Sequence, residues 1–169
     1  MTQRIVVITG SAGGIGTAMS NRFAKDGDIV VGLDLAHGFD LTQPQHCHDA
    51  IDKVIAEHGR IDVLCNNAGI SSVGDVVDST LADWQRVFAV NVFGIANMSR
   101  AALPHMRKRS SGFVVNTCSI AATVGLVERA VYSASKGAVL SLTKAMAADE
   151  IAHNIRVNCV SPGTVSSPW

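Results

Sequence analysis

Three side chains near the middle of the sequence could together move a proton. Tyr132 and Lys136 are four residues apart, and Ser119 precedes Tyr132 by thirteen residues. A tyrosine hydroxyl has an unperturbed pKa of about 10, so it exchanges a proton with an alcohol near pH 7 only if a nearby cation stabilises the phenolate. On a helix, a spacing of four places Tyr132 and Lys136 on one face. The pattern predicts an acid/base site, and a chance pair of exposed side chains is the alternative.

A glycine-rich loop near the start of the chain is the second chemical feature. The apolar run Arg4 to Thr9 predicts a buried strand that leads into glycines at positions 10, 13, 14 and 16, and a helix is expected from about Ile15. Glycines allow close approach of a pyrophosphate to the backbone, and a helix N-terminus attracts its charge. Position 12 is Ala, so the Gly-x-Gly-x-x-Gly pattern is not strictly met. The loop still predicts a dinucleotide site.

Together these features resemble the short-chain dehydrogenase/reductase family. The family's cofactor loop, Thr-Gly-x-x-x-Gly-x-Gly, matches Thr9 to Gly16 at each fixed position. Further motifs follow in the family's order: Asn66-Asn67-Ala68-Gly69, Asn91, the trio Ser119/Tyr132/Lys136, and Pro162-Gly163. Five ordered motifs are far more specific than any one of them. The resemblance covers essentially the whole chain and implies one NAD(P)-binding Rossmann domain over residues 1–169.

Alternating apolar and helical segments predict the same α/β fold. Strands are expected at Ile5–Thr9, Ile29–Leu33, Ile61–Asn66, Gly112–Thr117 and Ile155–Val160, and helices near Ile15–Asp26, Pro44–His58, Leu81–Arg107 and Ala130–His153. This rhythm is typical of a doubly wound parallel sheet with helices on both faces. Ligands of such sheets bind over the carboxyl ends of the strands.

Two departures from the family pattern affect the expected fold. Only five residues separate Asp34 from Asp40, which is too few for the family's usual helix. The family's third strand, which would lie just before Asp40, is therefore expected to be vestigial. The sequence stops at Trp169, soon after Pro162-Gly163, where relatives usually continue into substrate-lid helices and a last strand. We therefore expect a fold without that strand and lid, either as a natural short form or as a fragment.

Asp34 indicates which dinucleotide is bound. It follows the second predicted strand, where a carboxylate bonds ribose hydroxyls and repels a 2′-phosphate, and the loop residues Ser11, Ala12 and Gly13 include no base. NAD(H) is therefore favoured over NADP(H), with a surface aspartate as the alternative. The resemblance implies that the cofactor is bound by Gly10, Ser11, Gly13, Gly14, Ile15, Gly16, Asp34, Leu35, Asp40, Leu41, Asn67, Ala68, Gly69, Tyr132, Lys136, Pro162, Gly163, Val165 and Ser167.

The resemblance also implies a reaction, hydride transfer between the nicotinamide and a secondary alcohol or ketone. Tyr132 is the expected acid/base, Lys136 lowers its pKa and binds the nicotinamide ribose, and Ser119 orients the substrate oxygen. Asn91 lies in an apolar helical segment, where a buried amide needs partners, and in the family it supports a proton relay to the lysine. A truncated dinucleotide-binding or interaction module with little turnover is the alternative, and a scaffold without cofactor is disfavoured by the intact motifs.

Composition excludes several other functions. The chain has 14 basic and 14 acidic residues, so no charge excess suggests nucleic acid as a partner. The basic run Arg107-Lys108-Arg109 is expected to complement a helix dipole. No segment is typical of a secretory signal or membrane span, and a cytoplasmic location is expected.

The two long helices, rich in Ala, Val and Met, predict a homodimer like those that members of the family form through these helices.

The cysteines predict buried thiols and not a metal site. Cys65 and Cys159 lie in expected strands and Cys118 directly follows one, which favours free buried thiols. Adjacent side chains diverge on a helix, so His46-Cys47-His48 cannot share one metal. The run is expected at a polar helix start.

Overall fold

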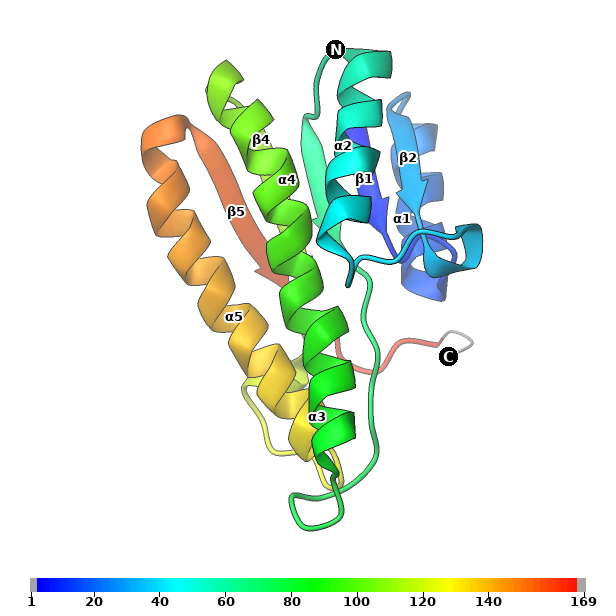
Figure 1. The fold of residues 1–169 in the computed structure, drawn as a ribbon, viewed down its shortest axis with the longest axis vertical. Coiled ribbons are helices and arrows are strands. Elements are labelled where there is room, and N and C mark those ends of the chain that lie inside the picture. Colours follow the sequence, from blue (N-terminus) through cyan, green and yellow to red (C-terminus); the bar gives the residue numbers. More distant parts are fainter. Residues whose placement is uncertain (1–2, 167–169) are drawn as a thin grey trace.

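Five parallel strands form one sheet in the computed structural model, which describes residues 3–166 (Figure 1). The strands are β1 (Ile5–Thr9), β2 (Ile29–Leu33), β3 (Val63–Asn66), β4 (Gly112–Thr117) and β5 (Ile155–Val160). Their order across the sheet is β2-β1-β3-β4-β5, and Val7 of β1 is aligned with Val31 on one side and Leu64 on the other. The doubly wound parallel sheet predicted from the sequence is confirmed, with β3 two residues shorter than expected.

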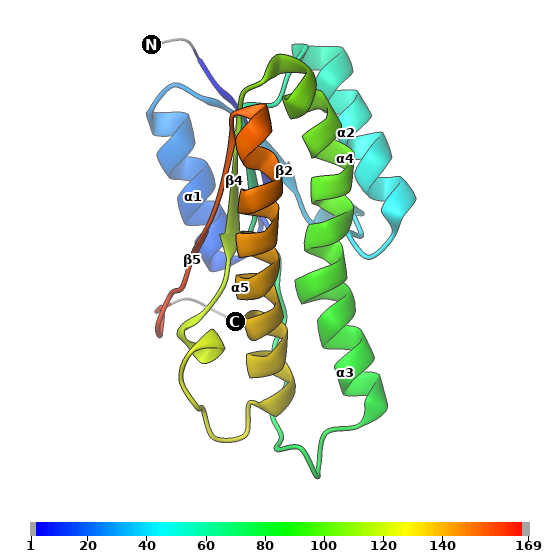
Figure 2. The same ribbon diagram turned by 90° about the vertical axis from the view of Figure 1, so that its left-hand side faces the viewer.

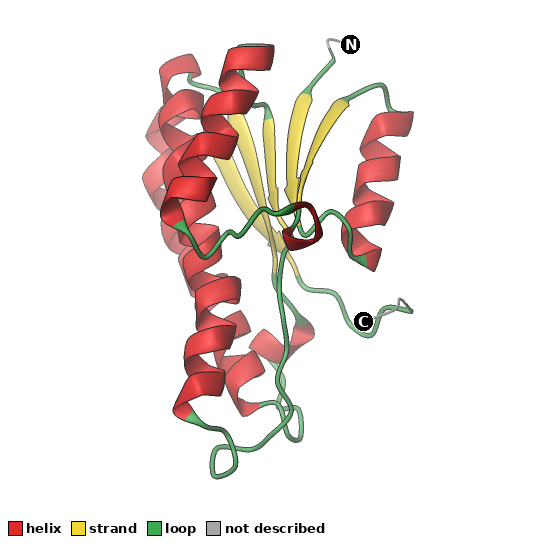
Figure 3. Cartoon of the chain, turned by 45° about the vertical axis from the view of Figure 1, so that its right-hand side comes forward, coloured by secondary structure: helices red, strands yellow, loops and turns green. Residues whose placement is uncertain are grey.

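Helices cover both faces of this sheet. The helices are α1 (Gly14–Lys25), α2 (Pro44–His58), α3 (Leu81–Phe88), α4 (Gly94–Arg109) and α5 (Ala130–Glu150). Figures 2 and 3 show α1 on one face and α2, α4 and α5 on the other. Each face has its own core. Val6 and Ile8 pack toward Phe23 of α1, whereas Ile5 and Val7 belong to the larger cluster on the opposite side. Strands buried on both faces explain the continuous apolar runs in the sequence.

The long helix expected over Leu81–Arg107 is divided by a π-helical turn. α3 begins with a capping box between Thr80 and Asp83, and the π turn Ala89–Phe93 separates it from α4. Asn91 lies in this turn and is fully buried. Such wide turns inside α-helices often occur at functional sites. The basic run predicted at the helix end does lie in the last turn of α4, where Arg107 also binds the buried Glu150 of α5.

The segment between Asp34 and Asp40 contains no strand, which corrects the expectation of a vestigial one. Residues Leu35–His37 form a 3-10 turn instead, and Gly38 ends it with φ 81°. The Asp34 side chain accepts a hydrogen bond from the Ala36 N–H, and the Asp34 carbonyl accepts from Phe39. These hydrogen bonds fold the five residues into a local turn, so none of them pairs with the edge of β2.

Smaller expectations are met only in part. Cys47 is buried at the start of α2 and not at a polar surface, because its helix packs on α4 with this side chain inward. Cys159 is only half-buried, since β5 lies at the sheet edge. α5 ends at Glu150, and a 3-10 turn, Ile151–His153, follows it.

Two loops at one end of the molecule are joined by a short backbone bridge. The Gly74 N–H donates to the Glu128 carbonyl at 3.0 Å, and the Ala130 N–H donates to the Gly74 carbonyl at 3.2 Å. The bridge connects the segment between β3 and α3 to the one between β4 and α5. No helix within residues 3–166 has the length and apolar character needed to cross a membrane.

Candidate active site

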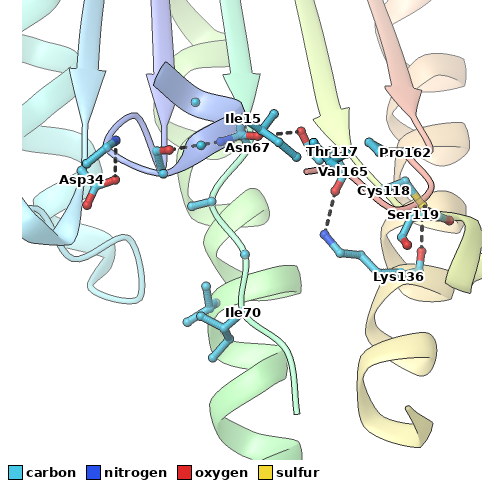
Figure 4. Close-up of a pocket in the computed structure, with 18 of the residues that line it drawn as sticks. Ile15, Asp34, Asn67, Ile70, Thr117, Cys118, Ser119, Lys136, Pro162 and Val165 are labelled. Carbon is cyan, nitrogen blue, oxygen red and sulfur yellow. Dashed lines mark hydrogen bonds between the residues drawn. The ribbon is translucent and has the colours of Figure 1, made fainter. Parts of the chain in front are cut away.

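A cavity of about 810 Å³ runs along the carboxyl ends of the strands (Figure 4). Residues of all the predicted motifs except Asn91 line it. The predicted lining members are Gly10, Gly13, Gly14, Ile15, Gly16, Asp34, Leu35, Asp40, Leu41, Asn67, Ala68, Gly69, Ser119, Tyr132, Lys136, Pro162, Gly163 and Val165. Its position fits the rule for ligand sites in open α/β sheets. Ser167, predicted to contact the cofactor, lies outside the described residues.

The glycine loop packs so closely against its own backbone and the segment after β3 that side chains at Gly10 and Gly16 would not fit. Gly10 has φ 66°, and a β-carbon there would lie 2.7 Å from the Ala68 Cα. A β-carbon on Gly16 would collide with the Gly10 carbonyl oxygen. Gly13 caps α1 without a side-chain hydrogen bond, and the first turn of α1 carries no acidic residue. The free N–H groups at this helix start therefore fit a pyrophosphate.

Ser11 does not line the cavity, although the resemblance implied a cofactor contact. Its side chain packs against β2, where a β-carbon on Gly32 would lie 2.7 Å from the Ser11 Oγ. The Ser11 carbonyl accepts a hydrogen bond from Thr17. Ser11 therefore supports the loop on the side that faces β2, away from the cavity.

Asp34 is fixed at the cavity rim by two backbone groups. One carboxylate oxygen accepts from the Ala12 N–H and the other from the Ala36 N–H, both at 2.9 Å. Each oxygen keeps a free lone pair for a further donor. Nearby, Thr42 donates to Asp40 from both its backbone and its hydroxyl, and these bonds lower the pKa of the Asp40 carboxyl. Both ends of this wall thus present fixed carboxylates.

The catalytic candidates meet around a buried ammonium group. The Lys136 side chain is 4% exposed, its Nζ donates to the Thr117 carbonyl at 2.8 Å, and it lies 5.7 Å from the centre of the Tyr132 ring. Burial lowers the pKa of Lys136 to about 8. The predicted helical pair is therefore real: α5 carries both side chains at its start.

Ser119 lies where β4 ends, as predicted. It caps a 3-10 turn, Ile120–Ala122, and its Oγ accepts from the Ala121 N–H at 3.2 Å. A hydroxyl that accepts one bond can still donate its own proton. The Ser119 O–H is thus available to an oxygen atom in the cavity.

Asn91 does not line the cavity, and its side chain is connected to the site through the backbone of Ile70. Its Oδ1 accepts from the Ile70 N–H at 2.8 Å, and its Nδ2 donates to the Ile70 carbonyl and to the Ser135 hydroxyl. These bonds satisfy the buried amide and fix the segment after β3 beside Lys136. A β-carbon on Gly69 would be 3.3 Å from the Asn91 Oδ1 and 3.4 Å from the Lys136 Nζ.

The paired asparagines have different partners. Asn66 is buried and donates to Asn116, which ties β3 to β4. Asn67 donates to the carbonyls of Thr9 and Gly10, and its own oxygen accepts from the Thr117 hydroxyl. A chain of contacts therefore runs from the glycine loop through Asn67 and Thr117 to Lys136.

Sequence reasoning missed several lining residues. These are Ala12, Leu33, Phe39, Ile70, Val90, Thr117, Cys118, Ile120 and Thr164, and most of them are apolar. Thr117 could have been found as the last residue of a strand facing the site. The apolar ones carry no chemical signal in a sequence, because wall and core residues are of the same types. Within the described part of the chain, no group of three His, Cys, Asp or Glu side chains is arranged to hold a metal.

Comparison with known proteins identifies the family. The family model for short chain dehydrogenase matches residues 34–169. A 2-(R)-hydroxypropyl-CoM dehydrogenase of Xanthobacter autotrophicus is 38% identical, over 98% of this chain and 76% of that protein. The chain belongs to the short-chain dehydrogenase family and is an oxidoreductase of that family.

Solved structures of relatives have the same fold. An NAD⁺-bound xylitol dehydrogenase has a TM-score of 0.91 and 32% identity, over 95% of this chain and 70% of that one. An NADP-bound structure of ElxO has a TM-score of 0.93 and 30% identity, over 98% of this chain and 75% of that one. Structural relatives of this chain thus bind nicotinamide cofactors of both kinds.

Proposed function

We propose that this chain is an NAD(H)-dependent oxidoreductase that interconverts a secondary alcohol and its ketone, with Tyr132 as the acid/base. The main support is the buried ammonium of Lys136, held by the Thr117 carbonyl beside the Tyr132 ring and in the same cavity as Ser119. We also propose that residues 1–169 form one dinucleotide-binding domain, which the single sheet supports.

Most of the proposed roles follow from observed contacts. Tyr132 gives its proton to the ketone oxygen, and the charge on Lys136 stabilises the phenolate that remains. Ser119 donates a hydrogen bond to the same oxygen, since its Oγ already accepts from Ala121. Asn91 fixes the cavity wall at Ile70, and its part in a proton relay to Lys136 is carried over from the family and not from a contact. When bound, the nicotinamide supplies the hydride, so ketone, NADH and a proton become alcohol and NAD⁺.

The cofactor preference rests on Asp34. Its two fixed oxygens suit a ribose diol, and they oppose a phosphate on the same ribose. Lys136 supplies the one cationic side chain among the described lining residues, and it lies at the catalytic end of the cavity. The relatives do not decide this point, because one is bound to NAD⁺ and another to NADP.

Fluorescence titration of the chain with NADH and NADPH, followed by addition of ketones, tests the proposal. We expect saturable NADH binding, at least about tenfold tighter than NADPH binding, and oxidation of NADH by a secondary ketone. Binding without turnover of any ketone would contradict the enzymatic assignment and favour a binding module. Equal or tighter NADPH binding would contradict the role of Asp34 alone.

A pair of variants sharpens the cofactor test. Asp34→Ser removes the rim charge and should bring the two dissociation constants together. Asp149→Asn removes one negative charge from an exposed site outside the cavity lining and should leave their ratio unchanged. If both variants shifted the ratio equally, net charge and not the rim carboxylate would set the preference.

We also propose a homodimer formed through the long helices, including α4 and α5. Leu81 at the start of α3 and Phe93 in the π turn that leads into α4 are large apolar residues that remain 72% and 59% exposed, which supports a covered surface in an assembly. Sedimentation at micromolar concentration is expected to show a dimer, and Phe93→Asp should weaken it at least about tenfold. The control Phe113→Asp, on the strand β4, should leave the dimer intact. A monomeric parent protein would contradict the proposal.

A further inference from the structure

The part of the cavity next to Ser119 and Tyr132 has apolar walls. Ile70 follows β3, Ile120 opens the turn after Ser119, and Leu126 lies on the loop that leads to α5. Val165 adds a further aliphatic wall from the segment after β5. Figure 4 shows Ile70, Ser119 and Val165 from these separate elements around the same space. Ile120 and Leu126 are 39% and 40% exposed, so their side chains are not buried in the core.

The cavity has few charged groups, and one of them, Lys136, lies near Tyr132. Among the described lining residues the charged ones are Asp34, Asp40 and Lys136. The two carboxylates lie after β2, on the part of the wall assigned to the adenosine. Lys136 is buried beneath Tyr132 and already donates to Thr117. Near the catalytic hydroxyls, the described walls therefore offer no free cation that could pair with an anionic substrate.

The charged side chains on the nearby loops lie outside the cavity lining. Glu128, Asp75 and Asp78 are exposed on the two bridged loops, and they would repel an anion. Arg129 is the basic residue there, and its guanidinium donates to the Glu128 carbonyl outside the cavity lining. An anion moved into an apolar site without a partner loses its hydration and gains little in return.

Resting on the proposed function, we propose that the alcohol or ketone substrate is uncharged and apolar around its reacting carbon. Simple alkyl or cycloalkyl secondary alcohols fit the aliphatic walls of Ile70, Ile120 and Leu126. Substrates that carry a carboxylate, sulfonate or phosphate into this part of the cavity, including at the end of a short alkyl chain, are disfavoured, because its described lining offers no free cation for such a group. The reaction balances as for any ketone: hydride adds to carbon, the Tyr132 proton adds to oxygen, and NADH is oxidised.

A matched pair of ketones tests the substrate class. 2-Heptanone and 6-oxoheptanoate are methyl ketones of equal chain length that differ by a terminal methyl or carboxylate. With NADH and the 169-residue protein, kcat/KM for 2-heptanone should exceed that for 6-oxoheptanoate by at least about 100-fold. Equal rates, or a preference for the keto acid, would overturn the inference and leave the oxidoreductase assignment standing. Oxidation of NADH by neither ketone nor by cyclohexanone would overturn both.

Binding gives a readout that does not depend on turnover. In the Tyr132→Phe protein loaded with NADH, 2-heptanone should change the nicotinamide fluorescence with a saturable curve. 6-Oxoheptanoate should change it only at concentrations about 100-fold higher. Equal affinities in this titration would also overturn the inference.

A charge added to the wall should redirect the preference. Leu126→Lys places an ammonium beside the substrate and should lower the ratio of the two kcat/KM values at least about tenfold, with a gain for 6-oxoheptanoate. Val77→Lys adds the same charge on an exposed residue of the neighbouring loop, outside the cavity lining, and should leave the ratio unchanged. An unchanged ratio in folded Leu126→Lys protein, or equal shifts in both variants, would overturn the inference.

Discussion

Replacing Tyr132 with phenylalanine is expected to lower kcat for ketone reduction by about 10³-fold, in the range typical of a lost general acid. The ring would stay, so its contact with the Lys136 ammonium would stay as well. Only the hydroxyl that carries the proton is removed. NADH affinity should therefore change by less than about threefold, and steady-state kinetics with fluorescence titration of the same protein would show both results.

A second hydroxyl provides the comparison for this variant. Ser119→Ala removes a hydrogen-bond donor but leaves the Tyr132 proton in place, so its loss of kcat should be smaller, about 10-fold to 100-fold. Full activity of Tyr132→Phe, or an equal loss of NADH binding and of turnover, would show that Tyr132 is not the acid.

Replacing Lys136 with methionine is expected to abolish turnover and yet to raise the free energy of unfolding at pH 7. Burial lowers the pKa of Lys136 from 10.5 to about 8, so the folded state holds this charge at a cost of about 3 kcal/mol at low pH. Methionine removes that cost but leaves the Thr117 carbonyl without its donor, which costs about 1 kcal/mol. The net gain at pH 7 should be about 2 kcal/mol, measured by urea denaturation.

The pH dependence of this gain has a definite sign. Below pH 8 the lysine is protonated in both states, so the whole burial cost is present in the parent protein. Between pH 8 and pH 10.5 the folded side chain is already neutral while the unfolded one still binds a proton, so the parent becomes more stable as pH rises. The advantage of Lys136→Met should therefore shrink above pH 8.

An exposed lysine on the same helix serves as the control. Lys144→Met removes a charge from the surface of α5 and should change the unfolding free energy by less than about 0.5 kcal/mol at any pH. Destabilisation by Lys136→Met at pH 7 would mean that the ammonium stabilises the fold, contrary to the burial argument.

Much of the fold was predictable because local signals and buried strands agree. The apolar runs that became β1 and β5 are confirmed at their predicted bounds. The π turn was not predictable, because the sequence from Leu81 to Arg107 has continuous helical character. The π turn coincides with the pairing of Asn91 with Ile70, a contact between residues 21 positions apart that local sequence does not reveal.

The residues of the site were likewise predictable only in part. Residues with distinctive chemistry, such as Asp34 and Lys136, were predicted as lining residues and do line the cavity. Ser11 was assigned by resemblance alone, and the small Gly32 opposite it lets its side chain turn to β2 instead. Ile120 was missed because an isoleucine has the same pattern in a substrate wall as in a core.

The bridge between Gly74 and the Glu128–Ala130 segment couples the motions of two loops that each lead to a lining residue of the cavity. The loop that follows Ile70 and the loop that carries Leu126 are fastened to each other at this point, so neither can swing away alone. The two loops are therefore coupled, and either one moves away from the other only when both backbone hydrogen bonds break together.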